Sequence, residues 1–469
     1  MTPIAGRARA GWADMAVASP APNPFLTLGF LSFCFYVFAF YSRILDLGLG
    51  SLHLPGVAFG FAIVVAVLTG RIVLVLQDRI AVYLVGLSLC LMIAIPGSFW
   101  RGGSFAVLTK SWIPTMMLFL VGGAVVSTLT QCRRSLYVVG LAAAAGALLV
   151  MLRGRMSHER LVLEGSRFAN PNTIAIMLLL GMPMVWLLAA NSRAGMFRKV
   201  LVGGLLIVML AALFRSGSRE GLVGLAVLGV STFVRSSPGG KLRITIAMAL
   251  LVAGTALFLP RSLKSRFGTI IQGITVETQD AQTVEEKSLL ISAGGSSQTR
   301  WRLLLSSLQL TGQHPLLGVG PGNFAPYLAK HESAKGVSAL WVGTHNTYTQ
   351  VSSEVGIPAL CLYVATLLSS MRALGRIYRR ARGIPGEEAH DIATMALALH
   401  TGFIVFCICA LFDHMAYEMT MPLMAGITVA INRAAPDELS RLEDAERRQE
   451  GAPGSFLPVL PKRRGSVAG

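Results

Sequence analysis

Residues 173–190 read TIAIMLLLGMPMVWLLAA, a run without a charged side chain. A helix of this length and composition crosses about 30 Å of hydrocarbon. Similar runs recur along the 469-residue chain, which is 53% hydrophobic and 14% charged. Backbone groups in lipid must be satisfied within the segment, and no alternating ten-residue barrel pattern occurs, so we expect helices. The sequence therefore predicts an all-α polytopic membrane protein.

Twelve candidate spans follow from the apolar runs. They lie near residues 25–42, 55–76, 80–96, 112–130, 135–152, 173–190, 199–214, 221–234, 244–260, 355–371, 391–412 and 418–432. An even number places both termini on one side. With that side in the cytoplasm, every inner connection is basic and nearly free of acids, as the positive-inside rule predicts. The net charge of +18 is thus attributed mostly to membrane orientation, and no nucleic-acid partner is expected.

The chain divides into five predicted parts. Residues 1–24 form a disordered cytoplasmic leader, 25–260 a bundle of about nine transmembrane helices, and 261–354 one long periplasmic loop. Residues 355–432 form the C-terminal transmembrane helices, and 433–469 a cytoplasmic tail. The first apolar run is longer than a typical signal-peptide core and lacks a clean cleavage site, so we interpret it as an uncleaved span.

The outward connections carry more arginines than the positive-inside rule predicts. These are Arg153, Arg155, Arg160, Arg167, Arg215 and Arg219. Guanidinium groups stay charged and pair bidentately with phosphate oxygens, so they suit a lipid-anchored diphosphate at the membrane boundary. The alternative is that short loops tolerate exceptions to the rule.

The long loop ends with Thr344-His345-Asn346-Thr347-Tyr348, just before the next apolar run. An imidazole titrates close to neutral pH, so His345 is the best candidate for a general base. The alternative is a hydrogen-bonded loop histidine. Earlier in the loop, the apolar-rich residues 301–310 predict a helix, and the glycine-rich residues 318–323 predict a tight turn. This turn does not match GxGxxG, which argues against a nucleotide site.

Carboxylates in the outer loops are few and show no DxD spacing. A diphosphate enzyme that uses Mg²⁺ or Mn²⁺ would normally supply carboxylate ligands. The sequence therefore favours arginine in place of a metal, and no cofactor is predicted, although Glu220, Glu332 and Glu354 keep the question of a metal open. The six cysteines show neither a disulfide framework nor zinc spacing.

Four outward segments follow one another in a specific order. They are Ser166–Asn172 (SRFANPN), Ser216–Gly221 (SGSREG), Arg300 with the later His314–Gly320 (HPLLGVG), and Thr344–Tyr348 (THNTY) followed by Glu354-Val355-Gly356. In order, spacing and position at the outer ends of spans, these segments resemble the O-antigen ligase and polymerase superfamily of bacterial envelope enzymes. The resemblance covers roughly residues 166–358 and the overall pattern of spans.

The resemblance implies glycan transfer in the periplasm from a polyprenyl diphosphate carrier, usually undecaprenyl. The acceptor is lipid A–core in ligases and a lipid-linked glycan in O-antigen or exopolysaccharide polymerases. The implied fold is similar to the class C glycosyltransferase fold, in the bacterial inner membrane, and the implied reaction is metal-independent and inverting.

The functional residues of the family fall, by local motif, on Arg219, Arg300 and His345. Arg302 competes with Arg300 for the role of the loop arginine. The residues expected to contact the substrate are Arg215, Arg167, Arg302, Asn346, Tyr348 and Asn172, although Asn172 also suits a helix cap.

Other functions stay open on the sequence alone. A flippase or transporter for lipid-linked oligosaccharides usually places ionisable groups near mid-membrane, whereas the span centres of this chain are nearly bare apart from His400. A protein O-oligosaccharyltransferase would use the same donor with a protein hydroxyl as acceptor. Ligase and polymerase share their donor chemistry, so the sequence does not separate them.

Overall fold

In a computed structural model of the chain, residues 23–47, 52–157, 160–164, 167–190, 194–258, 284–334 and 342–450 are described. The predicted leader up to residue 22, the tail from residue 451, and loop residues 259–283 and 335–341 lie outside the described residues. The described chain is almost entirely helical, with one antiparallel hairpin that pairs Arg155 with Val162.

Long apolar helices alternate with shorter helical turns along the chain. The N-terminal half contains α1 (Pro24–Ser42), η1 (Ile44–Leu47), α2 (Leu54–Leu68), α3 (Arg71–Leu76), α4 (Arg79–Ala94), α5 (Arg101–Val107), the π-helical turn η3 (Leu108–Trp112), α6 (Ile113–Val125), α7 (Leu129–Arg153), β1 (Arg155–Ser157), β2 (Arg160–Val162), η4 (Arg167–Ala169), α8 (Pro171–Ala190), α9 (Met196–Arg215) and α10 (Arg219–Arg235). The rest contains α11 (Pro238–Phe258), α13 (Val284–Gln313), α14 (Phe324–Ala334), α15 (Thr347–Val355), α16 (Ile357–Arg382), α17 (Glu387–Cys409) and α18 (Thr420–Glu450).

Seven helical stretches among the described residues are long and apolar enough to cross a membrane. They are α1, Arg101–Val125, α7, α8, α9, α16 and α17, and α2 and α4 are shorter apolar helices. The protein is therefore a polytopic, all-α integral membrane protein, as predicted. Each predicted span overlaps one or more helices, while the full count of about twelve crossings stays a prediction.

Two of the differences between the predicted spans and the helices have a clear local cause. The span expected at 55–76 is interrupted, because α2 ends at Leu68 and Gly70 turns the chain with a φ of 66° before α3. The span expected at 112–130 instead covers Arg101–Val125. It ends early because the Thr128 hydroxyl accepts from the backbone N–H of Gln131, at 3.2 Å, and so caps the start of α7.

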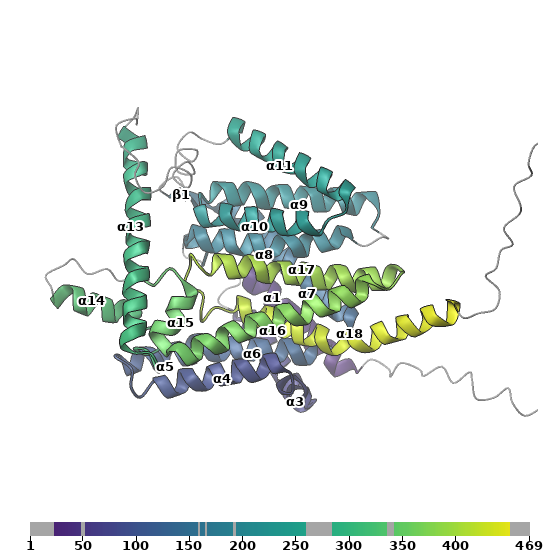
Figure 1. The fold of residues 1–469 in the computed structure, drawn as a ribbon, viewed down its shortest axis with the longest axis horizontal. Coiled ribbons are helices and arrows are strands. Elements are labelled where there is room, and N and C mark those ends of the chain that lie inside the picture. Colours follow the sequence, from purple (N-terminus) through teal and green to yellow (C-terminus); the bar gives the residue numbers. More distant parts are fainter. Residues whose placement is uncertain are drawn as a thin grey trace, which may run out of the picture.

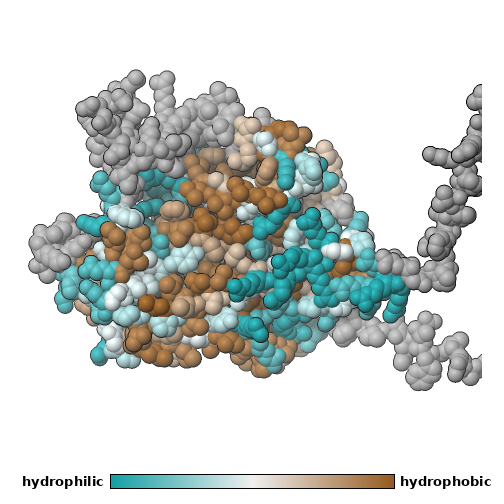
Figure 2. Space-filling model, viewed as in Figure 1, coloured by the Kyte–Doolittle hydropathy of each residue, from teal (hydrophilic) through white to brown (hydrophobic). Residues whose placement is uncertain are grey.

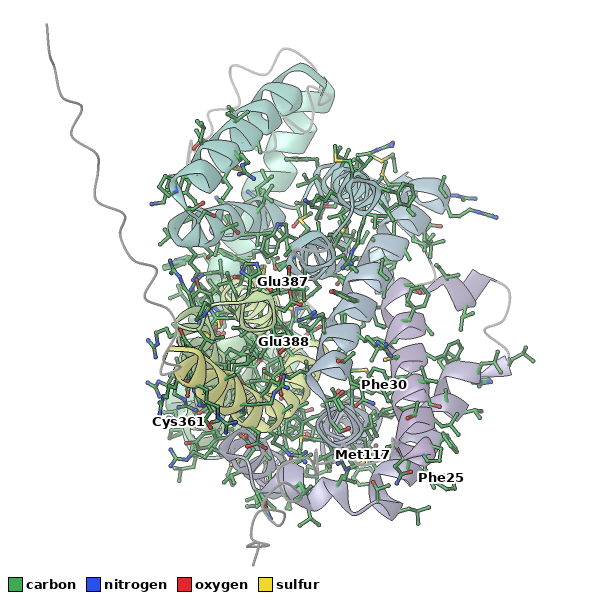
Figure 3. All side chains as sticks on the ribbon, turned by 90° about the vertical axis from the view of Figure 1, so that its right-hand side faces the viewer. Phe25, Phe30, Met117, Cys361, Glu387 and Glu388 are labelled. Atoms are coloured by element: carbon green, nitrogen blue, oxygen red, sulfur yellow. The ribbon has the colours of Figure 1, made fainter. Side chains whose placement is uncertain are left out.

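The bundle is built around α8, which packs against α7, α9, α10 and α17 (Figure 1). Apolar side chains also cover much of the outside. On α1, Phe30 is turned into the bundle, whereas Phe25 is 66% exposed at its edge (Figure 3). On the face drawn in Figure 2, a broad apolar region lies between hydrophilic residues at the two ends of the molecule. A patch of this extent fits a lipid-facing surface.

The long loop is folded at one end of the bundle. There α13 runs across the end of the bundle instead of along it, and α14 and α15 lie beside it (Figure 1). The helix predicted at residues 301–310 is confirmed as part of α13. The C-terminal part of α18 extends from the opposite end of the bundle. The loop thus forms a layer over one end, where α8, α10 and α16 begin and α17 ends.

The glycine-rich turn lies directly on the end of α15. The backbone N–H groups of Val319 and Gly320 donate to the carbonyls of Ser353, at 3.0 Å, and Glu354, at 2.8 Å. Gly318 has a φ of 62°, and a Cβ there would lie 2.2 Å from the carbonyl carbon of Glu354. Only glycine meets both conditions. The predicted tight turn is confirmed, and its backbone donors serve the fold.

The Glu354 carboxylate joins this turn to the α17–α18 connection. One oxygen accepts from the Gly322 N–H at 2.8 Å and the Tyr417 hydroxyl at 2.7 Å, and the other accepts from the Phe324 N–H at 3.2 Å. Burial raises the pKa of Glu354, and the hydrogen bonds from Tyr417, Gly322 and Phe324 oppose that rise. The sequence kept Glu354 as a possible metal ligand. In the structure, both of its carboxylate oxygens accept hydrogen bonds from the protein.

We expect Glu354→Ala to destabilise this end of the bundle by about 3 kcal/mol, because three buried donors lose a charged acceptor. The measurement is the free energy of unfolding, or the melting temperature, of the protein in detergent. The matched control is Glu388→Ala, since Glu388 makes an exposed ion pair with Arg441 at 3.0 Å, and such pairs contribute little. Equal stability of the two variants would contradict the assignment.

Candidate functional site

Three connecting segments at one end of the bundle meet at the buried side chain of Asn172, at the start of α8. Its amide oxygen accepts from an Arg160 guanidinium NH2 group at 2.8 Å and from the Ser218 hydroxyl at 2.9 Å. Arg160 also donates through Nε to the Ser216 carbonyl at 3.0 Å. The hairpin, the Asn-Pro-Asn motif and the start of α10 are thereby held together. The expected capping role belongs to Asn170, whose side chain accepts from the Asn172 N–H at 2.9 Å.

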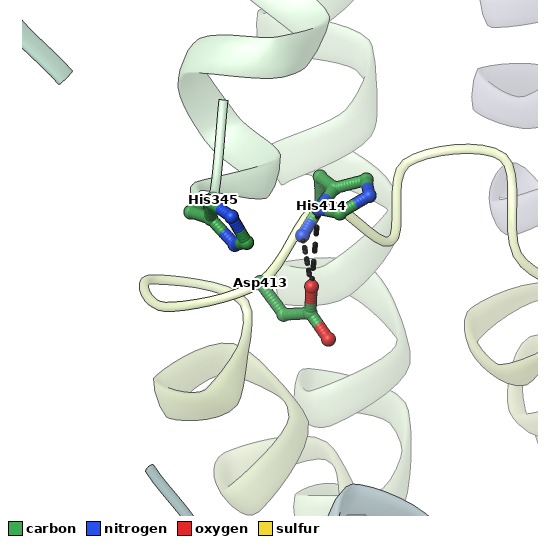
Figure 4. Close-up of side chains that lie close together, drawn as sticks. All are labelled: His345, Asp413 and His414. Carbon is green, nitrogen blue, oxygen red and sulfur yellow. Dashed lines mark hydrogen bonds and ion pairs between the residues drawn. The ribbon is translucent and has the colours of Figure 1, made fainter. Parts of the chain in front are cut away.

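A cluster of His345, Asp413 and His414 lies at the same end of the bundle (Figure 4). One oxygen of Asp413 accepts from the backbone N–H of His414 at 2.8 Å and lies 3.2 Å from its ring Nδ1. The two imidazole rings meet edge to face, with centroids 5.2 Å apart. Thr347 fastens the loop to this connection, because its hydroxyl donates to the Asp413 carbonyl at 2.7 Å.

The backbone of His345 is strained. Its φ is 50°, one of three positive values at non-glycine residues among the described residues. Its Nδ1 is buried and has no hydrogen-bond partner within the protein. A left-handed conformation at a non-glycine residue and an unpaired buried nitrogen both cost free energy, and such features gather at functional sites. These two features mark His345 as a candidate functional residue.

The two imidazoles have pKa values shifted in opposite directions. Burial and the positive charges of His414 and Arg300 together lower the pKa of His345 to about 4, against the opposing effect of Asp413. The hydrogen bond and charge of Asp413 raise the pKa of His414. His345 is therefore a neutral proton acceptor at neutral pH, while His414 is the more readily protonated partner. Neighbouring titratable groups whose pKa values are shifted in opposite directions are typical of acid–base sites.

Glu220, in the first turn of α10, brings a further buried carboxyl to the site. It is 2% exposed, and neither carboxyl oxygen has a hydrogen-bond partner. Burial and the nearby charge of Asp413 raise its pKa well above the usual range, while the charges of Arg300 and Arg160 lower it. Arg300 therefore acts electrostatically on both Glu220 and His345, so the structure brings α10, α13 and the end of the loop to one place.

The other predicted residues are less closely gathered. Arg219 is half-buried beside Glu220, whereas Arg302 on α13 and Arg215 at the end of α9 are exposed, and the side chain of Arg167 lies outside the described residues. Asn346 caps α15 and donates to the Leu411 carbonyl at 3.2 Å, and the Tyr348 hydroxyl donates to the Cys407 carbonyl at 3.0 Å. These two side chains hold the loop against the end of α17.

Sequence reasoning did not single out Arg160, Asp413 or His414 as site residues. Arg160 was one of several outer arginines without a motif. Asp413 and His414 could have been chosen as site residues, because they are adjacent in the short connection between two apolar runs. Ionisable groups in such a place are costly near lipid and invite a functional explanation.

The cluster also has the chemistry of a cation site. His345, Asp413 and His414 each offer one ligand atom, and these atoms lie within 4.8 Å of one another. Imidazole and carboxylate donors suit Zn²⁺ or Mn²⁺. Ligands that share one zinc ion at about 2.0 Å lie about 3.3 Å apart. The Asp413 oxygen and the His414 Nδ1 already lie 3.2 Å apart, although an ion there would replace the hydrogen bond between them.

Residues 204–364 match the family model of O-antigen ligase. This part of the chain is an O-antigen ligase domain. The predicted superfamily of ligases and polymerases is thus confirmed, and with it a membrane function in glycan transfer. No curated protein matches the chain. The matched range contains Arg219, Arg300 and His345, whereas Asp413 and His414 lie beyond it.

Proposed function

We propose that the protein transfers a glycan from a polyprenyl diphosphate carrier, of the undecaprenyl type, to an acceptor hydroxyl at the periplasmic face of the inner membrane. The acceptor is lipid A–core or a lipid-linked glycan, and both termini are cytoplasmic. The observation that carries the proposal is a neutral, strained His345 within the electrostatic reach of Arg300, in an O-antigen ligase domain.

The leaving diphosphate gains negative charge as its bond to the sugar breaks. Arg300 and Arg219 supply fixed positive charge, and such charge is most effective in a partly dry site at the membrane surface. Arg160 supports this arrangement by holding Ser216 and Asn172 in place. The arginines thus take the part that a divalent cation has in many diphosphate enzymes.

His345 takes the proton of the acceptor hydroxyl as the acceptor oxygen bonds to the anomeric carbon. The bond from that carbon to the diphosphate oxygen breaks, and the diphosphate leaves with the electron pair. Attack from the face opposite the diphosphate inverts the anomeric centre. Asp413 stabilises the imidazolium that forms, because its charge favours protonation of His345. The Asp413–His414 pair therefore acts as a positioning and electrostatic partner of the base.

We expect the acid limb of the pH–rate profile to lie near pH 4. The base is active when neutral, so activity falls as the pH drops through the pKa of His345, which is about 4. In His414→Ala one of the charges that lower this pKa is removed, and the limb should move to higher pH. The measurement is kcat/KM between pH 3.5 and 8. A wild-type limb near 6.5 with no shift in the variant would contradict the assignment.

We expect chelator to leave the transfer rate unchanged, because arginines replace the cation. The measurement is the initial rate after treatment with EDTA and dialysis, and the control is the rate after adding back Mg²⁺, Mn²⁺ or Zn²⁺. Loss of activity with chelator that one of these ions restores would assign the cluster of His345, Asp413 and His414 to metal binding instead.

The decisive experiment uses purified protein in detergent with an undecaprenyl-diphosphate-linked glycan and no ion gradient. A ligase or polymerase forms a new glycosidic bond, whereas a flippase leaves the donor intact. Lipid A–core, a second lipid-linked repeat and a hydroxyl-bearing protein are offered in separate reactions. The product shows which acceptor is used and separates ligase, polymerase and protein O-oligosaccharyltransferase. An intact donor in every reaction would overturn the proposal.

A further inference from the structure

A cavity of about 230 Å³ opens beside the His345–Asp413–His414 cluster. Its walls come from the end of α1, the start of α8 and the α17–α18 connection. Asp413 and His414 line it directly, so it shares a wall with the candidate catalytic cluster. The volume is below the roughly 300–1,000 Å³ of pockets for drug-sized ligands, which leaves room for about one sugar residue.

The two asparagines of the Asn-Pro-Asn motif have different surroundings. Asn172 turns its amide oxygen to Arg160 and Ser218. Asn170, two residues earlier, lines the cavity. An attack from the face opposite the leaving diphosphate needs donor and acceptor on different sides of the anomeric carbon. The two asparagines, two residues apart at the start of α8, contact two such regions, since Asn170 faces the cavity and Asn172 faces Arg160 and Ser218.

The wall of the cavity has the mixed chemistry that binds a saccharide. Tyr41 and Phe168 supply aromatic surface for the apolar face of a sugar ring. Asn170, Glu418 and Arg43 supply an amide, a carboxylate and a guanidinium for its hydroxyl groups. Purely apolar walls would suit a lipid chain, and a purely basic wall would suit a diphosphate. The mixture fits neither of these as well as it fits a sugar.

We propose that this cavity is the acceptor subsite, which holds the sugar residue that carries the attacking hydroxyl against the Asp413–His414 side of the cluster. The inference rests on the proposed function and adds the location of the acceptor. The polyprenyl diphosphate donor lies on the other side of the Asn-Pro-Asn motif. The acceptor sugar belongs to a lipid A–core oligosaccharide or to a polyprenyl-linked repeat, and both present the same chemistry to the cavity.

The test fills the cavity without substituting a residue of the cluster. Thr173 lines the cavity from the first turn of α8, and Thr173→Trp occupies its space. Arg43→Asn is a second variant, which removes the guanidinium; asparagine tolerates the φ of 58° at this position. The matched control is Thr232→Trp, at an exposed position of α10. Melting temperatures of the variants verify that the bundle stays folded.

Kinetics and direct binding are measured with defined probes. At saturating donor, we expect both cavity variants to raise the acceptor KM at least tenfold, with the donor KM unchanged. Two acceptors are used, lipid A–core and an undecaprenyl-diphosphate-linked repeat, and the one whose KM rises is the occupant of the cavity. Without donor, binding of lipid-free core oligosaccharide and of the repeat unit is followed by saturation-transfer NMR. Wild type and His345→Ala should bind one of them, and Thr173→Trp should bind neither.

Three outcomes would overturn the acceptor subsite. The first is a donor KM that rises in the cavity variants while the acceptor KM stays constant. The second is sugar binding that is unchanged in Thr173→Trp, and the third is the absence of sugar binding in wild type. The proposed function would fail in a different way. The cavity would then still bind a saccharide, but no glycosidic bond would form. That result would keep the saccharide site and reject the transferase activity.

Discussion

His345→Ala should lower glycan transfer by about 10²–10⁴-fold, the usual contribution of a positioned general base, while the protein stays folded and inserted. The imidazole is the neutral group with a buried, unpaired nitrogen at the centre of the candidate site. The measurement is the initial rate of glycosidic bond formation by purified protein at fixed donor and acceptor concentrations.

Two further variants separate loss of the base from other effects. His345→Asn keeps a residue type that tolerates a left-handed backbone and still lacks the base, so it should be as inactive as the alanine variant. His331→Ala is the control for removal of an imidazole at the same end of the bundle, because His331 is exposed and stacks on Tyr327 at 4.3 Å. Near-normal turnover by both His345 variants would remove this residue as the base.

Arg300→Ala should weaken transfer by ~2–4 kcal/mol of transition-state stabilisation, the range found for charge-stabilising donors. The reason is that the diphosphate leaves with a negative charge that the half-buried Arg300 guanidinium stabilises. Arg300→Lys should recover only part of the rate, since an ammonium lacks the bidentate planar fork. The measurement is kcat/KM for the lipid diphosphate donor.

Arg302→Ala provides a matched control two residues away on the same helix. Arg302 is exposed, whereas the charge of Arg300 acts on His345 and Glu220. We therefore expect Arg302→Ala to stay within about threefold of wild type, as surface substitutions usually cost little. A larger loss in Arg302→Ala than in Arg300→Ala would reverse the assignment of the loop arginine.

The candidate site was partly predictable from sequence. The order of the motifs around Arg219, Arg300 and His345 pointed to a ligase or polymerase, and the domain match covers all three. Sequence did not show that Asp413 and His414 stand beside His345, because the two segments are far apart along the chain and nothing local signals the contact. It also left the role of Glu354 open, which the buried hydrogen bonds to Gly322, Phe324 and Tyr417 resolve.

Sequence alone determined that this protein is a helical membrane bundle, because uncharged runs such as residues 173–190 can satisfy their backbone only within a helix in lipid. Because this requirement applies within each segment, the composition and length of an apolar run suffice to predict a membrane helix. The tertiary structure decided which polar residues share a site and in which direction their pKa values are shifted. It folds α13 across the end of the bundle and places His345 against the α17–α18 connection. It also places Asn170 at the cavity and Asn172 beside Arg160 and Ser218. Burial and neighbouring charge shift a pKa, and both arise only when distant segments pack together.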